Sequence, residues 1–273
     1  MTPEGDVLSD NPRFVDIHCH MLPGLDDGPV NLGVSLAMAE IAVADGIQAV
    51  IVTPHQLGTY GRNRGATIRA FADRFQSELQ QREIALRVLP GADVRIEPDL
   101  VSRLEAGEVL TLADRRRHVL LELPHELYLP LEGLLRRLDA AGIVGILSHP
   151  ERNQGLLREP QLVADLVDAG CLMQVTAGSL VGSFGGQIRD FAASLIEEGL
   201  VHFVATDAHG TTCRRPRMSA AFERIVGLAG DRYAEELCSA NPAAIAAGRD
   251  IAGGRRRRAR FRPCGWFPRR RAS

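Results

Sequence analysis

The sequence contains no lysine. Its basic residues are 32 arginines, which are always positively charged, and 8 histidines. The absence of lysine excludes the lysine of a Walker-type phosphate loop, a Schiff-base lysine and a carbamylated lysine that bridges two metal ions. Chemistry at any active site must therefore come from carboxylates, histidines and arginines.

Cysteines are few and widely separated, at Cys19, Cys171, Cys213, Cys238 and Cys264. They form no CxxC pair, which argues against a disulfide framework or a structural zinc site and fits a reducing compartment. Cys264 and Arg270 match the C-x5-R spacing of cysteine phosphatases. We treat the match as coincidence, because arginine is abundant there and a nucleophilic cysteine needs backbone amides and a helix N-terminus to lower its pKa.

Long apolar runs are also missing. No stretch is long and apolar enough to cross a bilayer, and the first residues, MTPEGDVLSDNPR, are acidic and polar, unlike a signal peptide. We therefore expect a cytoplasmic protein. The 273 residues are 45% hydrophobic and 24% charged, which is ordinary for a globular chain with a substantial core.

Charge is unevenly distributed along the chain. Nine of the 32 arginines and no acidic residue follow the glycine pair at 253–254, which leaves 23 basic against 34 acidic side chains before it, a formal charge of −11. Like-charge blocks are commonly disordered. We expect an N-terminal tail over 1–13, one domain over 14–250 and a disordered arginine-rich tail over 251–273. The latter could contact the acidic body or anionic lipid at the inner membrane, or stay solvated; we expect no specific nucleic-acid partner.

Two patterns alternate through the body of the chain. Seven apolar runs read FVDIH, IQAVIVT, LRVLPGADV, HVLLEL, IVGILSH, CLMQVTA and VHFVATD, with amphipathic helical stretches between most of them. This alternation indicates a parallel sheet covered by helices. Seven units in about 200 residues favour an α/β fold of the closed or nearly closed barrel type. No GxGxxG follows the first run, which argues against a dinucleotide-binding fold.

Nearly every apolar run ends in a histidine or a carboxylate. The carboxyl ends of barrel strands meet at one mouth, where barrel enzymes place their active sites. Side chains two residues apart share a strand face, so we expect Asp16, His18 and His20 to point into the mouth together. The same spacing aligns Asp207 with His209. The remaining strand-end candidates are His55, Asp93, Glu122 and His149.

Each of these residues also has an ordinary structural explanation. A single strand-end histidine is more often a hydrogen-bonding residue than a metal ligand, and Asp27 in DDGP could be a turn residue. The metal-ligand interpretation becomes the better one because these residues converge on one site. So many ionisable groups are costly to bury together unless cations offset the carboxylates. Imidazole and carboxylate without thiolate suit Mn, Fe or Zn. Cys19 alternates to the opposite face, and we expect His118, His125 and His202 to be structural.

The same strings resemble a known family. DIHCH with DDGP, VTPH, GADV, LLELP, ILSHPER and VATDAHG followed by RRP are similar, in this order, to motifs of the polymerase and histidinol phosphatase (PHP) superfamily. They are most similar to its bacterial protein-tyrosine phosphatase branch, encoded with capsule and exopolysaccharide genes. The resemblance runs from Asp16 to about Asn241. It implies a distorted (β/α)7 TIM-like barrel with three divalent metals, often manganese, with Fe, Zn, Mg or Co as alternatives, and often a homo-oligomer.

The resemblance also implies roles for individual residues. The implied metal-binding residues are His18, His20, His55, Asp93, Glu122, His149, Asp207 and His209. Asp27, or a cluster histidine such as His55, would handle the proton, while Arg152 and Arg215 would hold the substrate phosphate. Two positions depart from the family pattern: Asp93 stands where glutamate is usual, and GTTCRRP is one residue longer, so Arg214 could replace Arg215. The arginine-rich tail lies outside the pattern.

Residue chemistry and resemblance imply the same reaction. A divalent cluster lowers the pKa of bound water, and arginine forks match phosphate oxygens. We expect metal-bound hydroxide to attack protein phosphotyrosine in line, on a cytoplasmic tyrosine kinase of polysaccharide export. Two alternatives remain: a phosphoesterase for a small phosphate such as histidinol phosphate or a sugar phosphate, and a non-catalytic metal-containing regulator. A shallow mouth would favour a peptide, and GTYGRNRG, Gly58 to Gly65, is a candidate flexible rim loop.

Overall fold

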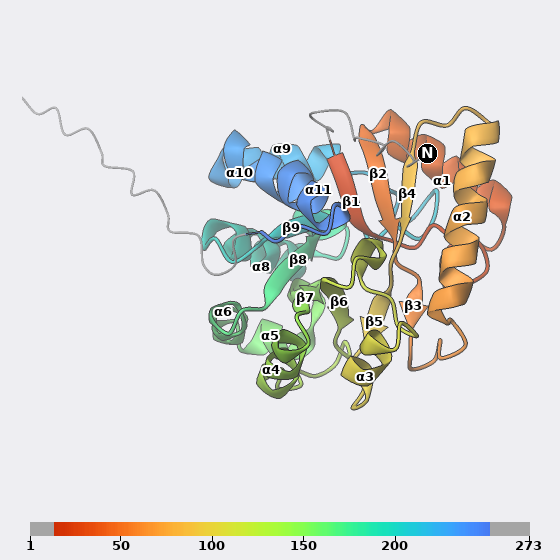
Figure 1. Ribbon diagram of the computed structural model, residues 1–273. Coiled ribbons are helices and arrows are strands. Elements are labelled where there is room, and N and C mark those ends of the chain that lie inside the picture. The colour runs from red at the N-terminus through yellow and green to blue at the C-terminus, as the bar shows by residue number, and fades with distance from the viewer. Residues whose placement is uncertain (1–13, 252–273) are drawn as a thin grey trace, which may run out of the picture.

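Two parallel sheets, one of three strands and one of six, lie at the centre of the molecule, and helices pack around their outside (Figure 1). The computed structural model describes residues 14–251. The strands are β1 (Phe14–Cys19), β2 (Ile47–Val52), β3 (His55–Gln56), β4 (Arg87–Pro90), β5 (Asp93–Arg95), β6 (His118–Glu122), β7 (Val144–Ser148), β8 (Leu172–Thr176) and β9 (Phe203–Ala205).

The helices fall into two size classes. The longer ones are α1 (Leu32–Ala44), α2 (Gly65–Gln81), α4 (Glu132–Ala140), α6 (Gln161–Asp168), α8 (Gly186–Glu197) and α9 (Ser219–Ala229). The shorter ones are α3 (Leu100–Glu105), η1 (Leu112–Asp114), η2 (Pro150–Arg152), α5 (Gln154–Arg158), α7 (Ala177–Leu180), α10 (Asp231–Glu235), η3 (Glu236–Ala240) and α11 (Asn241–Ala246). Helices α1, α2, α4, α6 and α8 lie between the apolar runs, where helical stretches were predicted, whereas α9 follows the last run and was not predicted.

The strands make a ring of seven positions, because β2 and β3 share one position and β4 and β5 share the next. Pro54 and Pro90 lie at these two breaks, where a residue without an N–H interrupts the ladder. The pairing runs β1-β2-β4 in one sheet and β3-β5-β6-β7-β8-β9 in the other, and every strand pair is parallel. A bridge between Cys19 and Ala208 returns the ring to β1. The predicted (β/α)7 barrel fold class is therefore confirmed, with a ladder that is interrupted rather than continuous.

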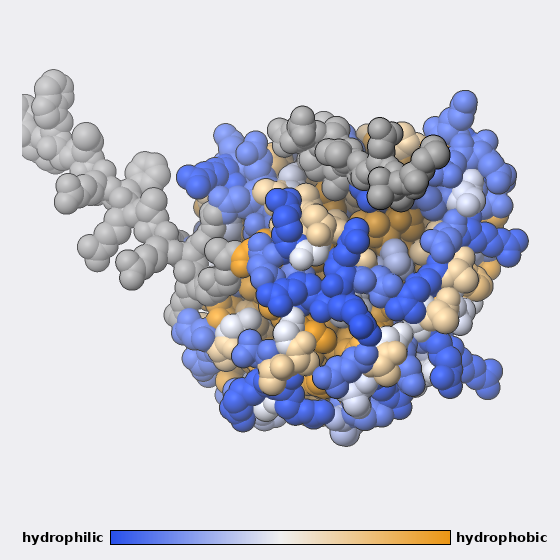
Figure 2. All heavy atoms as spheres, in the orientation of Figure 1, coloured by the Kyte–Doolittle hydropathy of each residue, from blue (hydrophilic) through white to orange (hydrophobic). Residues whose placement is uncertain are grey.

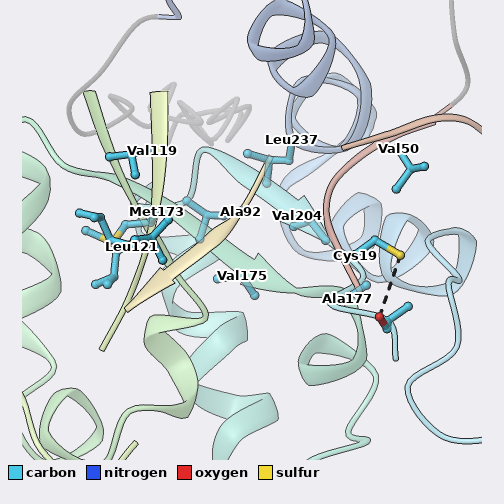
Figure 3. Close-up of a cluster of buried hydrophobic side chains, with 14 of the residues drawn as sticks. Cys19, Val50, Ala92, Val119, Leu121, Met173, Val175, Ala177, Val204 and Leu237 are labelled. Carbon is cyan, nitrogen blue, oxygen red and sulfur yellow. Dashed lines mark hydrogen bonds between the residues drawn. The ribbon is translucent and has the colours of Figure 1, made fainter. Parts of the chain in front are cut away.

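Alternating strand side chains separate two apolar clusters. The inner cluster fills the barrel, with strand residues such as Val15, Ile17, Leu120 and Ile146. The outer cluster lies between the strands and the helices, and Val119, Leu121, Met173 and Val175 belong to it (Figure 3). Because strand side chains alternate with period two, strands such as β1, β2, β6 and β8 contribute to both clusters. Burial on both faces explains why the strands read as nearly continuous apolar runs.

The amino-terminal end of the barrel is closed by apolar side chains from outside the strands. Leu112 and Ala113 of η1 and Ile245 and Ala246 of α11 complete the inner cluster, and all four are buried. We call these four residues the amino-end plug. It leaves the opposite end, formed by the carboxyl ends of the strands, as the place where polar side chains can reach the barrel interior.

The face shown in Figure 2 is mostly hydrophilic, with apolar colour in smaller patches between charged side chains. Within residues 14–251, no helix combines the length and apolar character needed to span a bilayer. The predicted tails, 1–13 and 251–273, lie outside the described residues apart from Ile251, which packs against the inner cluster. The domain limits therefore stay predictions.

Candidate metal centre

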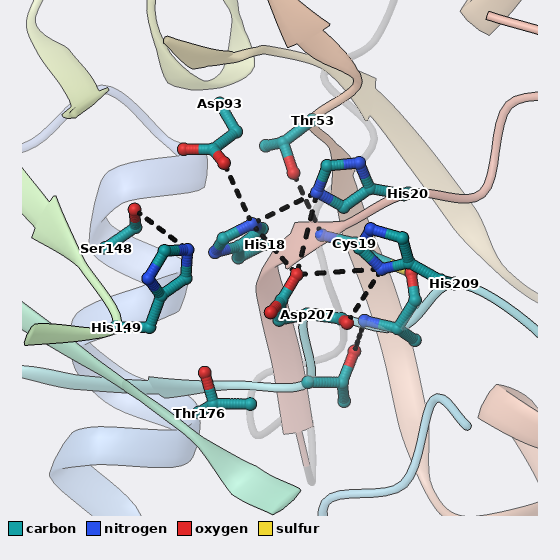
Figure 4. A network of polar contacts seen from close by, with 12 residues as sticks. His18, Cys19, His20, Thr53, Asp93, Ser148, His149, Thr176, Asp207 and His209 are labelled. Atoms are coloured by element: carbon teal, nitrogen blue, oxygen red, sulfur yellow. Dashed lines mark hydrogen bonds and ion pairs between the residues drawn. The ribbon is translucent and has the colours of Figure 1, made fainter. Parts of the chain in front are cut away.

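Histidine and carboxylate side chains converge at the carboxyl ends of the barrel strands (Figure 4). They form four overlapping groups, each with its ligand atoms within 4.8 Å of one another. The groups are His18–Asp93–His149, His18–His20–Asp207, His55–Asp93–Glu122 and His20–Asp27–His55–His209. The structure thus brings together all eight predicted metal-binding residues and Asp27, while their role as ligands stays a prediction.

The end of β1 contributes His18 and His20 to this cluster, but not Asp16. Val15 and Ile17 face the barrel interior, and an irregularity in strand pairing between Asp16 and Cys19 shifts the alternation. Asp16 instead accepts hydrogen bonds from the Thr206 hydroxyl and from its N–H at 3.0 Å. Burial raises the pKa of Asp16 to about 6. The expectation that Asp16 shares the mouth-facing side with the two histidines is wrong, because strict alternation does not allow for a bulge.

Buried polar neighbours orient the two β1 histidines. His18 Nδ1 lies 2.8 Å from Gln174 Oε1, and His20 Nδ1 lies 2.7 Å from Asp26 Oδ2. When Nδ1 donates to these acceptors, Nε2 of each ring is left facing the cluster, the arrangement found around metal-ligating histidines. Neither Gln174 nor Asp26 was predicted. The signals were a single polar residue inside CLMQVTA and the first aspartate of DDGP.

Carboxylates dominate the electrostatics around His55. Its Nδ1 lies 3.3 Å from Asp93 Oδ2 and 3.6 Å from Glu122 Oε2. Burial alone would lower the pKa of His55, but Asp93, Glu122 and Asp27 outweigh it and raise that pKa to about 9. Burial and then the Asp93 charge raise the pKa of Glu122 to about 7. The histidines therefore do not fully offset the negative charge of the carboxylates in the cluster. A bound cation would offset this excess negative charge.

The donor atoms fit divalent cations. Both carboxylate oxygens of Asp93 and the Nε2 atom of His209 are buried without a hydrogen-bond partner among the described residues. His18 Nε2 lies 3.3 Å from Asp207 Oδ1 and 3.6 Å from Asp93 Oδ2. Two ligands each about 2.1 Å from one cation are separated by roughly 3 to 3.5 Å, so these spacings suit shared ions. Because His18, His20, His55 and Asp93 each belong to two groups, the arrangement suits a cluster of ions rather than a single ion.

Thiolates take no part in this centre. The Cys19 sulfur lies 4.0 Å from the Ala208 carbonyl oxygen (Figure 3), and burial raises the pKa of the thiol well above its usual range. Cys19 is thus placed on the opposite face, as predicted. The four described cysteines are free thiols, and Cys264 of the C-x5-R spacing lies outside the described residues.

Two arginines lie against the cluster, and both contact Asp207. Arg152 Nη1 and Arg214 Nη2 each lie 2.5 Å from Asp207 Oδ2. The structure therefore places Arg214 at the cluster, whereas Arg215 is exposed. His125, expected to be structural, is instead an exposed residue whose Nε2 lies 3.1 Å from Arg152 Nη2. The contact of His125 with Arg152 could not be predicted from strand ends, because His125 lies three residues after the end of β6.

Three residues of the site have left-handed backbone conformations that favour glycine. They are His149 with φ 33°, Asp207 with φ 50° and Arg214 with φ 49°. Such conformations cost on the order of 1 to 3 kcal/mol each and persist where the surroundings fix the chain. Their concentration here shows that the backbone is held in place to present these side chains.

The predicted rim segment lies beside His55. The Tyr60 ring stacks on the His55 ring with centroids 5.3 Å apart, and the Asn63 amide donates to the His55 carbonyl oxygen at 2.9 Å. Asp27 Oδ1 lies 3.5 Å from His55 Nε2 and 3.3 Å from His209 Nε2, and its side chain is 50% exposed. This side of the mouth therefore combines an aromatic rim with a carboxylate that reaches solvent.

Sequence comparisons match this chain to one family and to relatives named as tyrosine-protein phosphatases. A model of the family described as "Capsular polysaccharide synthesis, CpsB/CapC" matches residues 14–247. Over 203 residues the chain is 39% identical to the tyrosine-protein phosphatase YwqE of Bacillus subtilis (strain 168), which covers 74% of this chain and 79% of that protein. It is 29% identical over 243 residues to the tyrosine-protein phosphatase CpsB of Streptococcus pneumoniae, covering 85% and 98%.

Structural comparisons agree. A chain from the crystal structures of YwqE and CpsB, described as unique metal-dependent tyrosine phosphatases, superposes with a TM-score of 0.84 and 33% identity, covering 89% of this chain and all of that one. The phosphotriesterase homology protein of Escherichia coli, with a TM-score of 0.57, 12% identity and coverage of 84% and 97%, shows the barrel fold alone. The resemblance predicted from the strand-end motifs is confirmed.

Proposed function

We propose that this chain, which belongs to the capsular polysaccharide synthesis family CpsB/CapC, is a metal-dependent protein-tyrosine phosphatase. One observation supports this activity above the others. A buried histidine and carboxylate cluster lies directly against two arginine side chains at the mouth of the barrel. Relatives named as tyrosine-protein phosphatases, at 39% and 29% identity, support the choice of substrate.

The metal ions would be held by the residues of the four groups, His18, His20, His55, Asp93, Glu122, His149, Asp207 and His209. Divalent cations supply two things to phosphomonoester hydrolysis: they lower the pKa of a bound water, and they neutralise phosphoryl oxygens. The smaller Asp93, in place of the glutamate usual in the family pattern, reaches both His18 at 3.6 Å and His55 at 3.3 Å. The shorter side chain therefore still joins two groups.

The chain's own residues provide phosphate binding. Arg152 and Arg214 present planar guanidinium groups at the edge of the cluster, and such forks match phosphate oxygens. We assign the second phosphate-binding position to Arg214 rather than to the exposed Arg215. The hydrogen bond from Arg152 to His125 and its contact with the Phe184 ring, 4.6 Å from the guanidinium carbon, restrict where that side chain can lie.

Proton handling falls to Asp27. The contact with His209, 3.3 Å between Nε2 and Asp27 Oδ1, together with the neighbouring histidines, lowers the pKa of Asp27 below its usual range. It is therefore a carboxylate at neutral pH that can accept a hydrogen bond from a water at the cluster, and its half-exposed side chain reaches solvent. His55, 3.5 Å from Asp27, is the neighbouring group through which a proton could pass.

We extend the proposal to the finer assignments. Manganese is the expected metal and three ions the expected number, supported by nitrogen and oxygen donors and by groups that share ligands. The expected substrate is a cytoplasmic tyrosine kinase of polysaccharide export, supported by the family description. The proposed location is the cytoplasm, peripheral to the inner membrane, and the proposed assembly is a homo-oligomer.

The test is phosphate release by metal-stripped protein after Mn, Mg, Fe, Zn or Co is added back. Substrates would be a phosphotyrosyl peptide, the matching phosphoseryl peptide and histidinol phosphate. We expect metal-restored release selective for phosphotyrosine, lost in His149→Ala and retained in Cys264→Ser. Turnover of histidinol phosphate alone would support a small-phosphate esterase instead, and metal binding without turnover of any ester would support a regulator.

A further inference from the structure

A cavity of about 490 Å³ adjoins the metal centre on the side of the two arginines. It lies between α7, the segment 181–184, the segment 212–217 and the first turn of α9. Arg214 and Thr206 belong to its lining, and Arg214 also contacts Asp207 of the cluster. A group attached to a phosphate at the cluster could therefore extend into this cavity.

The lining of the cavity is strongly biased in charge. Arg214, Arg215 and Arg217 all line it, and no aspartate or glutamate is among its lining residues in the described part of the chain. Arg214 is paired with Asp207, whereas Arg215 and Arg217 form no ion pair with any carboxylate of residues 14–251. Both are exposed, so their positive charge is available to a ligand.

The cavity lining also includes apolar side chains from the loop between α7 and α8. Phe184 and Val181 line the cavity, and the Val181 side chain is 48% exposed. The loop between α7 and α8 turns at Gly182 and Gly185, whose φ angles of 84° and 94° require glycine. The Ser183 N–H donates to the Gly178 carbonyl oxygen at 2.9 Å, which secures the residue next to Phe184.

Glu151 connects this loop to the phosphate-binding arginine. Its buried carboxylate accepts hydrogen bonds from the Ser179 hydroxyl at 2.7 Å and from the Thr176 N–H at 3.0 Å, at the start of α7. Arg152, the next residue, lies over the Phe184 ring. The cavity and Arg152 are therefore parts of one connected structure, with Phe184 of the cavity lining directly beside the Arg152 guanidinium group.

We propose that this cavity is a peptide subsite that selects acidic residues next to the phosphotyrosine, with Arg217 and Arg215 as specificity-determining residues. The proposal rests on the proposed phosphatase function. A carboxylate on the substrate meets two arginines without a competing acid, while Phe184 and Val181 contact the apolar parts of the peptide. A small phosphate would leave the cavity empty, so the subsite favours a protein substrate over a small phosphate.

The experiment compares three phosphotyrosyl peptides, identical except for glutamate, glutamine or arginine at the positions flanking the phosphotyrosine. The readout is the ratio of kcat/KM between the glutamate and glutamine peptides, measured with metal-loaded protein. A general loss of phosphate binding lowers both values and leaves the ratio unchanged. We expect the wild type to prefer the glutamate peptide by about tenfold at low salt, mainly through KM, and less at high salt.

The variants are Arg217→Gln, Arg215→Gln and the double substitution, with Arg136→Gln together with Arg158→Gln as the control. The control arginines are exposed on α4 and α5, away from the cavity, and form no ion pair within residues 14–251. The double variant should bring the ratio close to one, and the control should keep the wild-type ratio. Equal turnover of the three peptides by the wild type, or an unchanged ratio in the double variant, would overturn the subsite. Failure of the wild type to release phosphate from any of the peptides would instead refute the phosphatase function.

Discussion

The two ends of the barrel are built from the same strands and have opposite chemistry. At the amino end, Leu112, Ala113, Ile245 and Ala246 close the interior with apolar contacts. At the carboxyl end, histidines and carboxylates are buried together, and Asp93 has no hydrogen-bond partner for either oxygen among the described residues. The amino end of the barrel therefore stabilises the fold, whereas the carboxyl end presents groups that are costly to bury without a cation.

Substitution at the carboxyl end should have the largest effect. Asp207 contacts His18, His20 and His209 as well as both arginines. We expect Asp207→Ala to lower kcat/KM for a phosphotyrosyl peptide by more than about a hundredfold, since loss of a supporting residue alone costs 10- to 100-fold at metal sites. Bound metal would be measured alongside by elemental analysis.

The matched control for Asp207 is Asp250→Asn at the other end of the barrel. Asp250 is half exposed and pairs with Arg117 outside the cluster. This variant should keep its metal content and its kcat/KM. If Asp207→Ala retained both metal and activity, the mouth would not be the metal centre.

The plug provides the converse test. The Ile245 side chain is fully buried in the inner cluster. Ile245→Ala should lower the free energy of unfolding by about 2 to 4 kcal/mol, because it leaves a cavity where the barrel is closed. Activity per folded molecule should stay near that of the wild type. Denaturant unfolding and kinetics on the same preparations would check this, and a large loss of kcat with unchanged stability would contradict the separation of the two ends.

A residue inside the barrel, between the two ends, should have an intermediate effect. Gln174 is buried, and its Oε1 atom orients His18. Gln174→Leu should keep the fold and weaken metal affinity by about 10- to 100-fold, because the His18 ring loses the partner that fixes its tautomer. Metal titration would measure this, with Gln187→Leu, at an exposed position of α8, as the control. Equal affinities in the two variants would show that Gln174 only fills space.

Much of the fold was predictable because its signals are local. Seven apolar runs and the helices between them gave the barrel, and their terminal histidines and carboxylates gave the cluster. The amino-end plug was not predicted, since η1 and α11 are short apolar segments whose role depends on contacts far along the chain, such as that of Ile245 with the inner cluster. Asp16 was misplaced because a bulge in β1 is set by pairing with its neighbours.

The arginines show a second limit of sequence reasoning. Arg214 and Arg215 are adjacent, and the spacing GTTCRRP left both possible as phosphate-binding residues. The structure brings Arg214 against the cluster through a backbone feature, the left-handed conformation of Arg214, with its Nε donating to the Asp207 carbonyl oxygen at 3.2 Å. No residue type in this segment marks that turn, because arginine has no preference for positive φ.

The smallest expected effect concerns His118, a buried histidine at the amino end of β6. Burial lowers the pKa of His118 from 6.5 to about 4, and Asp250, 3.4 Å away, only partly offsets it. Between pH 6.5 and 4 the unfolded chain binds a proton that the folded chain excludes, so this contribution to stability is complete above pH 6.5 and is lost as the pH falls through that window. His118→Gln should remove it, on the order of 1 kcal/mol. The check is the difference in unfolding free energy between wild type and variant from pH 7 to pH 4, in metal-stripped protein, where titration of the mouth is common to both. If the curves of wild type and variant were parallel, the folded chain would not exclude the proton from His118. His118 would then be protonated in the folded state, and the amino end, like the mouth, would stabilise a buried charge.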